Sequence, residues 1–262
     1  TFEAAHGAAP AIAGEQLISG GGAAGGISSS SVEYGSFMGQ YSSPDTTESK
    51  YYQIISTGGT LKKLRVELAT APGTGTSWTF TVMQDTVATS LACSISDTST
   101  SCADTSNTVS ISAGDKVNLR ITPTNTPANP SYIRFSSVFA GTDNTETILM
   151  GNSYDDISTS GTVYMSLHGE SHGDDSTLTD VETLIPTSGT VKKLYVESSA
   201  APGSGNNCTF TVLKNGLATS LTCELGALGA ICYDTSNSFT VEAGDSIVLR
   251  NAITGTIGSM FC

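Results

Sequence analysis

The residues of this chain whose types and spacing best suit chemistry lie in the segment LHGESHGDD, residues 167–175. His168, Glu170 and His172 alternate there, so on a β-strand their side chains would point to one side, with Asp174 close behind. Imidazole nitrogens and carboxylate oxygens are ligands for a divalent cation. The competing interpretation is an exposed polar strand and loop, which needs no metal. We favour the exposed polar strand and loop and expect no cofactor, and a bound divalent cation is the alternative.

Covalent catalysis has little support in the sequence. A serine or cysteine nucleophile needs a base beside it, and the chain has only three histidines, of which His6 lies far from the other two. No Gly-x-Ser-x-Gly elbow precedes an acid and a histidine. The glycine-rich GGGAAGG lacks the Lys-Ser/Thr ending of a phosphate-binding loop. We therefore predict that the protein is not an enzyme.

Two weaker signals concern sugars. A glycan-binding module would present exposed aromatic rings, and the candidates are Tyr34, Tyr51, Tyr52 and Tyr233. Trp78 instead follows a core-facing pattern, so we expect it in the core. Asn207 begins an Asn-Cys-Thr triplet that matches an N-glycosylation acceptor, which has meaning only in a secretory pathway.

Charge and composition exclude several classes of protein. The formal net charge is −13, which repels phosphate backbones and anionic lipid, so we expect neither a nucleic-acid nor a membrane partner. No apolar run is long enough for a membrane-spanning helix. Only 13% of residues are Asp, Glu, Lys or Arg. Long amphipathic helices need these residues, so their scarcity predicts sheets joined by turns.

An internal repeat organises the chain. The segment DTSNTVSISAGDKVNLR begins at Asp104 and returns 130 positions later as DTSNSFTVEAGDSIVLR, which begins at Asp234. Residues 60–120 align with residues 190–250 without a gap. This indicates a duplicated domain, and we call its parts copy one and copy two. Asp115 and Asp245 recur after a glycine, as expected for carboxylates that accept N–H bonds within a turn.

The cysteines follow the repeat. Cys93 and Cys102 of copy one align with Cys223 and Cys232 of copy two, nine positions apart in both cases. This predicts one disulfide in each copy and an oxidising setting outside the cytoplasm. Copy two has two further cysteines, which would bridge its core or pair with another subunit: Cys208 and Cys262.

The periodicity within each copy is that of β-strands. Leu64, Val66 and Leu68 alternate with polar residues, and so do Val117, Leu119 and Ile121. We expect strands near residues 61–69, 77–84, 87–95, 107–112, 116–122 and 132–139, and two more in SVEYGSFMG and YYQIIST. Eight antiparallel strands fit a jelly roll. An immunoglobulin-like sandwich is the rival, but its Cys-Trp-Cys spacing is missing.

The predicted fold is therefore all-β, with two tandem jelly-roll β-sandwich domains at residues 32–141 and 162–262 and a linker at 142–161. Residues 1–31 are rich in Ala and Gly and show no strand alternation, which predicts an extended N-terminal arm. The arm is either disordered or ordered against a neighbouring subunit, because the edge strands of sheets accept added strands.

The phrases GTVKKLYVE, APGSG, TFTVLKNGLATSLTC and AGDSIVLR, with SYIRFSSVF of copy one, resemble a module of tailed-phage and environmental viral structural proteins. The AGD turn is also similar to that of the jelly-roll heads of the C1q and tumour-necrosis-factor type. Copy two departs from the pattern by ending at Cys262, short of the counterpart of residues 136–141, which leaves its final strand open.

The resemblance implies a virion surface component, such as a capsid decoration, fibre or spike protein, that self-associates or contacts other structural subunits. It places the protein on a virion surface or otherwise outside the cell. A secreted filament subunit or a cell-surface adhesin is the first alternative. A glycan-binding module that contacts host glycans is the second.

Overall fold

The computed structural model describes residues 14–22, 27–41, 44–143, 145–153, 155–171 and 174–262. The described chain is almost entirely β-structure, with two short 3-10 helices, η1 (Glu48–Tyr51) and η2 (Leu178–Asp180). Within these residues no helix has the length and apolar character needed to span a membrane. The prediction of an all-β sandwich fold is confirmed.

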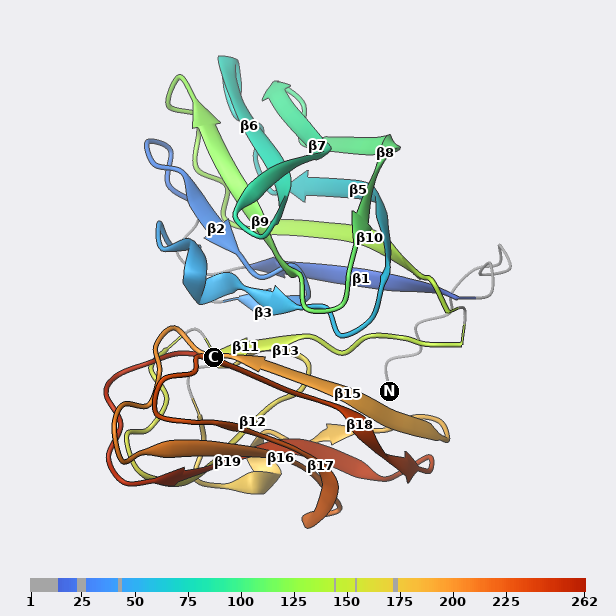
Figure 1. The fold of residues 1–262 in the computed structure, drawn as a ribbon. Coiled ribbons are helices and arrows are strands. Elements are labelled where there is room, and N and C mark those ends of the chain that lie inside the picture. The colour runs from blue at the N-terminus through green and yellow to red at the C-terminus, as the bar shows by residue number, and fades with distance from the viewer. Residues whose placement is uncertain (1–13, 23–26, 42–43, 144, 154, 172–173) are drawn as a thin grey trace.

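The first sandwich consists of two packed sheets (Figure 1). One has the strand order β3 (Gly39–Tyr41), β1 (Glu15–Gly22), β10 (Ile133–Gly141), β5 (Gly59–Leu68) and β8 (Ser101–Ile111). The other has the order β2 (Glu33–Gly35), β9 (Lys116–Thr124), β6 (Gly73–Gln84) and β7 (Val87–Asp97), and β4 (Gln53–Ile54) also pairs with β9. Apart from the hairpin of β6 and β7, which lies within one sheet, successive strands alternate between the two sheets, as in a jelly roll.

The second sandwich repeats most of this plan below the first in Figure 1. Its larger sheet has the order β12 (Gly161–Met165), β19 (Ser246–Thr254), β16 (Asn207–Lys214) and β17 (Leu217–Leu225), and β14 (Thr183–Leu184) also pairs with β19. The opposite layer is divided into two pairs of strands. They are β15 (Gly189–Glu197) with β18 (Ile231–Val241), and β11 (Gly151–Ser153) with β13 (Gly169–Ser171).

Strand alternation builds each core as the sequence predicts. Leu64, Val66 and Leu68 of β5 are buried, and Trp78 is buried in the same cluster with its indole N–H donating to the carbonyl of Ala128. Copy two places Cys208 at the position of Trp78, and Cys208 is also fully buried. Each sandwich therefore has its own hydrophobic core.

The hairpin turns also follow the sequence. Asn215 and Gly216 both have positive φ, at 49° and 77°, as a tight type I′ turn requires. Copy one holds the same conformation with Asp85 at 49° and Thr86 at 69°. A β-branched residue at positive φ is unfavourable, so copy one forms the same hairpin with a poorer turn sequence.

The repeated phrase DTSN forms a clamp between the two sheets of each sandwich. In copy two, the Asp234 carboxylate on β18 accepts N–H bonds from Thr222 on β17 and from Ser236 and Asn237, at 3.1, 3.0 and 3.0 Å. The side-chain amide of Asn237 adds a fourth bond at 2.9 Å. Asp104 of copy one has the same four kinds of donor. The phrase recurs because each sandwich needs this clamp.

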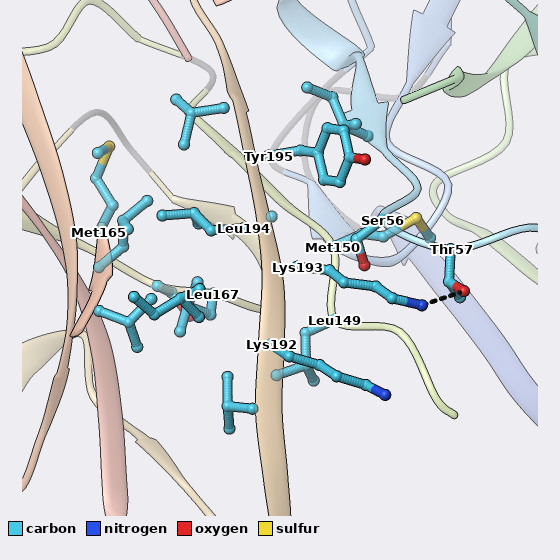
Figure 2. A pocket seen from close by; sticks show the side chains of 18 of the residues that line it. Ser56, Thr57, Leu149, Met150, Met165, Leu167, Lys192, Lys193, Leu194 and Tyr195 are labelled. Atoms are coloured by element: carbon cyan, nitrogen blue, oxygen red, sulfur yellow. Dashed lines mark hydrogen bonds between the residues drawn. The ribbon is translucent and has the colours of Figure 1, made fainter. Parts of the chain in front are cut away.

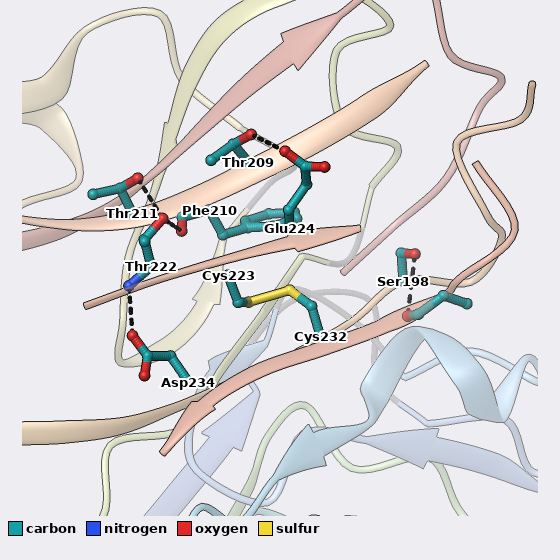
Figure 3. The surroundings of a disulfide bond; sticks show 10 residues. Ser198, Thr209, Phe210, Thr211, Thr222, Cys223, Glu224, Cys232 and Asp234 are labelled. Carbon is teal, nitrogen blue, oxygen red and sulfur yellow. Dashed lines mark hydrogen bonds between the residues drawn. A yellow bond between two sulfur atoms is a disulfide. The ribbon is translucent and has the colours of Figure 1, made fainter. Parts of the chain in front are cut away.

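A disulfide lies beside each clamp. Cys93 on β7 is bonded to Cys102 on β8, and Cys223 on β17 to Cys232 on β18, which confirms both predicted pairs. Figure 3 shows the second bond with Thr222 and Asp234 nearby. The bonded strands belong to opposite sheets. Each disulfide therefore fastens the two layers together, although its cysteines are only nine residues apart in the sequence.

Two predicted boundaries are wrong. The arm at residues 1–31 is not separate from the first domain, because Glu15–Gly22 forms β1 inside the first sandwich, antiparallel to β10. The sequence pattern for this strand is weak. Ile18 is the only buried apolar side chain of β1, and position 20 must be glycine because a Cβ there would lie 2.5 Å from the Phe135 ring. Residues 1–13, where the arm was expected to meet a neighbour, lie outside the described residues.

The linker at residues 142–161 is likewise not a free connection. Ile148 and Met150 lie in the core cluster of the first sandwich, and the next residues form β11 of the second. Gln16 on β1 holds the segment from the other side, because its side-chain amide donates to and accepts from the backbone of Ile148 at 2.8 and 2.7 Å. No periodicity in residues 142–161 predicts this docking.

Candidate strand-binding lane beside the second sandwich

The two copies differ by one strand. In the first sandwich β10 lies between β1 and β5 and pairs antiparallel with both. The counterpart of β1 is β11, because β1 pairs in parallel with β3 and β11 with β13, at Gly20–Gly39 and Gly151–Gly169. The counterpart of β5 is β15. Among the described residues no strand pairs with both β11 and β15. We call this space the open lane.

Side-chain burial shows the consequence. Leu61, Val109 and Leu119 of copy one are buried, whereas their counterparts Val191, Phe239 and Leu249 are only half-buried. The core of the second sandwich is therefore less completely covered on the side of the open lane.

A cavity of about 920 Å³ runs along the open lane. The cavity extends along both faces of β15, because no described strand pairs with the free edge of β15. Figure 2 shows Leu194 with Met165 and Leu167 on the core side of β15, and Tyr195 and Lys193 on the side of the first sandwich. The core side is apolar, and the far wall, from the first sandwich, includes Tyr52, Ile54, Ser56 and Thr57.

An ionic cluster closes one end of the cavity. Glu146 accepts hydrogen bonds from Lys192 and Lys193 at 2.6 and 2.7 Å, and from the Thr57 hydroxyl at 2.5 Å. Only 8% of the Glu146 side chain is exposed. The two lysines and the threonine lower the pKa of Glu146 to about 2. The carboxylate therefore remains charged and ties the linker to both sandwiches.

A second ion pair joins the two sandwiches directly. Lys116 of β9 lies 3.0 Å from Glu197 of β15, and its ammonium group stands over the ring of Tyr52, 4.8 Å from the centroid. Burial, with the carboxylates of Glu48 and Glu197, raises the pKa of Tyr52 to about 12. The phenol is therefore neutral near pH 7 and acts here as an apolar and hydrogen-bonding surface.

Buried polar contacts fix β11 against the first sandwich. Asn152 accepts a hydrogen bond from the Ser36 hydroxyl at 2.9 Å and donates one to the backbone of Lys50 at 3.0 Å. Gln53, which is fully buried, donates to the carbonyl of Met38 and, at 3.4 Å, to that of Met150. With the two ionic contacts, these bonds hold the sandwiches in a fixed relative position.

The C-terminal residues lie at one end of the open lane. The backbone of Ser199, just after β15, donates to the carbonyl of Phe261 at 2.8 Å, and the backbone of Ser153 on β11 donates to the carbonyl of Cys262. Both edges of the lane are therefore bridged at this point. Cys208 and Cys262 are free thiols in the second core region, so the predicted bridge between them is not formed. Burial raises the pKa of Cys208.

The described residues of the candidate metal site do not form a metal-binding cluster. His168 is exposed, and Asp174 accepts hydrogen bonds from the backbone and the hydroxyl of Ser158. The side chain of Glu170 and the whole of His172 lie outside the described residues. Among the residues that are described, no group of three or more His, Cys, Asp or Glu could hold a metal ion.

The candidate tyrosines do not form one sugar-binding surface. Tyr51 is fully buried and Tyr34 is half-buried against the first core. Tyr52 faces the cavity, and Tyr233 is exposed on β18, where it stacks with Tyr195 at a centroid distance of 5.6 Å. The four tyrosines were candidates because of their residue type, but they lie in separate parts of the fold.

Two smaller predictions have structural outcomes. Asn207 lies at the start of β16 with a buried side-chain oxygen, a position unlike the exposed loop that glycosylation needs. Asp115 and Asp245 accept backbone N–H bonds at 2.7 Å from Ser112 and Glu242, which confirms them as turn carboxylates.

Comparisons with known proteins identify no family. No family model matches the chain, and no curated protein matches it. A solved structure described as an "anti-sigma factor domain-containing protein" aligns over 80% of this chain and 75% of its own, with 12% identity and a TM-score of 0.21. A similarity this low carries no argument about fold or function.

Residue types alone do not predict the open lane, because the lane is defined by which strands are neighbours in a sheet. The alignment at an offset of 130 pairs Cys262 with Tyr132, the residue before β10, but it does not show that β10 lies in the middle of its sheet.

Proposed function

We propose that this protein is a non-enzymatic structural subunit of a virion surface, such as a decoration, fibre or spike component, assembled in many copies. The observation that supports it best is the rigid pair of similar sandwiches, held together by the docked linker and by Lys116–Glu197. Two linked surfaces at fixed spacing raise the effective concentration of the second contact once the first has formed.

The two disulfides support a site of action outside the reducing cytoplasm. The surface chemistry agrees with display, because a net charge of −13 keeps a Ser- and Thr-rich protein soluble at high local concentration. The sequence resemblance to viral structural modules supports the assignment to a virion.

A secreted filament subunit is the second candidate, because the two disulfides and the acidic surface rich in Ser and Thr suit it as well. A contact that repeats head to tail between subunits produces an open polymer.

Electron microscopy of the purified full chain, with light scattering to measure its mass, tests the proposal. We expect regular multimers, and addition of a reductant should weaken them because each sandwich loses its disulfide. Closed shells or rings would support a virion surface subunit, and open polymers would support a filament subunit. A protein that stays monomeric at every concentration, alone and with a partner particle, would contradict both.

A further inference from the structure

We propose that Leu228, Ile231 and Tyr233 of the second sandwich form a self-association surface, which binds the same surface of another copy of this chain. We call these three residues the apolar patch. The inference rests on the proposed function, because it names one contact through which copies of a structural subunit would join.

The apolar patch consists of large side chains that the fold leaves in solvent. Leu228 lies in the turn between β17 and β18 and is 95% exposed, and Ile231 and Tyr233 on β18 are 57% and 63% exposed. Ile231 and Tyr233 are two positions apart on one strand, so they share a face of it. Single exposed apolar residues are ordinary on a protein surface, but a contiguous group of them marks an interaction site.

Copy one shows that the fold does not need these large residues. The residues of copy one that align with the patch are small, and all three are exposed: Thr98, Ser101 and Ala103. They are exposed although β10 is in place in the first sandwich, so the exposure of the patch does not depend on that strand. The same sandwich therefore forms with small residues here, and the large apolar residues of copy two serve a contact with another molecule.

The patch is ordered before any partner binds. The Tyr233 ring stacks on Tyr195 of β15 at a centroid distance of 5.6 Å. Tyr195 in turn lies against the first sandwich, where a Cβ at Gly114 would be 3.8 Å from its ring. Cys232, between Ile231 and Tyr233, is fixed to β17 by its disulfide. Side chains that are already held in place lose little entropy on binding, so a small patch of this kind is sufficient for a contact.

The contact is made by side chains and not by an added strand. The backbone N–H groups of Ser236 and Asn237, farther along β18, donate to the Asp234 carboxylate. They are therefore not available to a strand from another molecule. A partner meets the face of β18 that Ile231 and Tyr233 share.

Charge indicates which partner the patch fits. Residues 225–233, LGALGAICY, contain no charged side chain, and Glu197, opposite Ile231 on β15, is paired with Lys116 at 3.0 Å. The chain as a whole has a net charge of −13, which draws basic partners to its other surfaces and repels acidic ones. At the uncharged patch two copies of the chain meet without bringing like charges together. An apolar patch is also complementary to itself across a two-fold axis.

Exchange of the patch for the copy-one residues tests the proposal in a fold that tolerates them. The triple variant carries Leu228→Thr, Ile231→Ser and Tyr233→Ala. Sedimentation velocity of the purified chain over a range of concentrations gives the dissociation constant of the dimer, and we expect the triple variant to raise this constant at least about tenfold. Leu217→Thr is the matched control, because Leu217 is 75% exposed at the start of β17, outside the patch, and it should leave the constant unchanged.

Salt and lipid vesicles separate this contact from two others. Added salt should strengthen the dimer, because it screens the repulsion between two acidic molecules, whereas a dimer that salt weakens is held by ion pairs and contradicts the proposal. Flotation with phosphatidylcholine vesicles is the second measurement. Vesicle binding that the triple variant abolishes, with no dimer in solution, would show a membrane-binding patch and would also overturn the proposal.

Failure of this inference is distinguishable from failure of the proposed function. A dimer that the triple variant leaves unchanged, or that Leu217→Thr weakens equally, would refute the patch. Multimers that persist in electron micrographs of the triple variant would leave the proposed function standing and refute only this inference. A chain that is monomeric alone but assembles on a partner particle would have the same meaning.

Discussion

Replacement of Asp234 with alanine should lower the free energy of unfolding by about 2–4 kcal/mol, because four donors around a carboxylate that is 8% exposed lose their acceptor. The donors lie on β17, at Thr222, and on β18 itself, at Ser236 and Asn237, so the clamp between the two sheets is lost. Urea denaturation measures the effect. Asp180→Ala is the matched control, because Asp180 belongs to η2 and has no such set of donors; its effect should stay within about 0.5 kcal/mol.

The pH dependence of the Asp234 contribution has a definite sign. Burial alone raises the pKa of Asp234, but the bonds from Asn237, Thr222 and Ser236 outweigh it and lower the pKa to about 2. The pKa of an aspartate in the unfolded chain is about 3.9. The stabilisation is therefore complete above that value and is lost as the pH falls toward 2. Asp234→Asn should remove this part of the acid sensitivity, and an unchanged acid-denaturation profile would contradict the clamp.

Loss of either disulfide should destabilise its own sandwich. Each bond joins cysteines nine residues apart, and the loop-closure entropy of such a loop corresponds to about 2–3 kcal/mol. We expect Cys223→Ser with Cys232→Ser to have the larger effect. The pair β15–β18 has no further strand beside it among the described residues, whereas β8 belongs to a sheet of five.

The matched variant, Cys93→Ser with Cys102→Ser, serves as the control for this difference. Denaturation followed by tryptophan fluorescence reports the first sandwich through Trp78, the single tryptophan. Circular dichroism reports both sandwiches. Identical unfolding midpoints for the two double variants would contradict the view that the second sandwich is the less supported one.

Much of the fold could be predicted because its determinants are local. Alternation in Leu64, Val66 and Leu68, the turn at Asn215-Gly216 and the aligned cysteines each depend on a few neighbouring residues. The repeat then allowed each interpretation to be checked against a second copy. For this reason the all-β architecture and both disulfides agree with the structure.

The remaining features depend on contacts between distant parts of the chain. Strand β1 is short and glycine-rich, and only its place beneath Phe135 explains Gly20. The tyrosines looked equivalent by type, yet Tyr51 is buried and Tyr233 is exposed. The open lane requires knowledge of which strands are neighbours, and β10 lies between β1 and β5, which are both far from it in the sequence.

Hydrogen exchange of residues 1–262, resolved to single amides, tests most directly whether β15 has an unpaired edge within this stretch of chain. The account predicts that lane-facing amides of β15 exchange at least about a hundredfold faster than the aligned amides of β5, since an unpaired amide lacks protection. Strands β6 and β16 calibrate the comparison, because each has neighbours on both sides. Equal protection of β15 and β5 after this calibration would show that the lane is closed and would contradict the account.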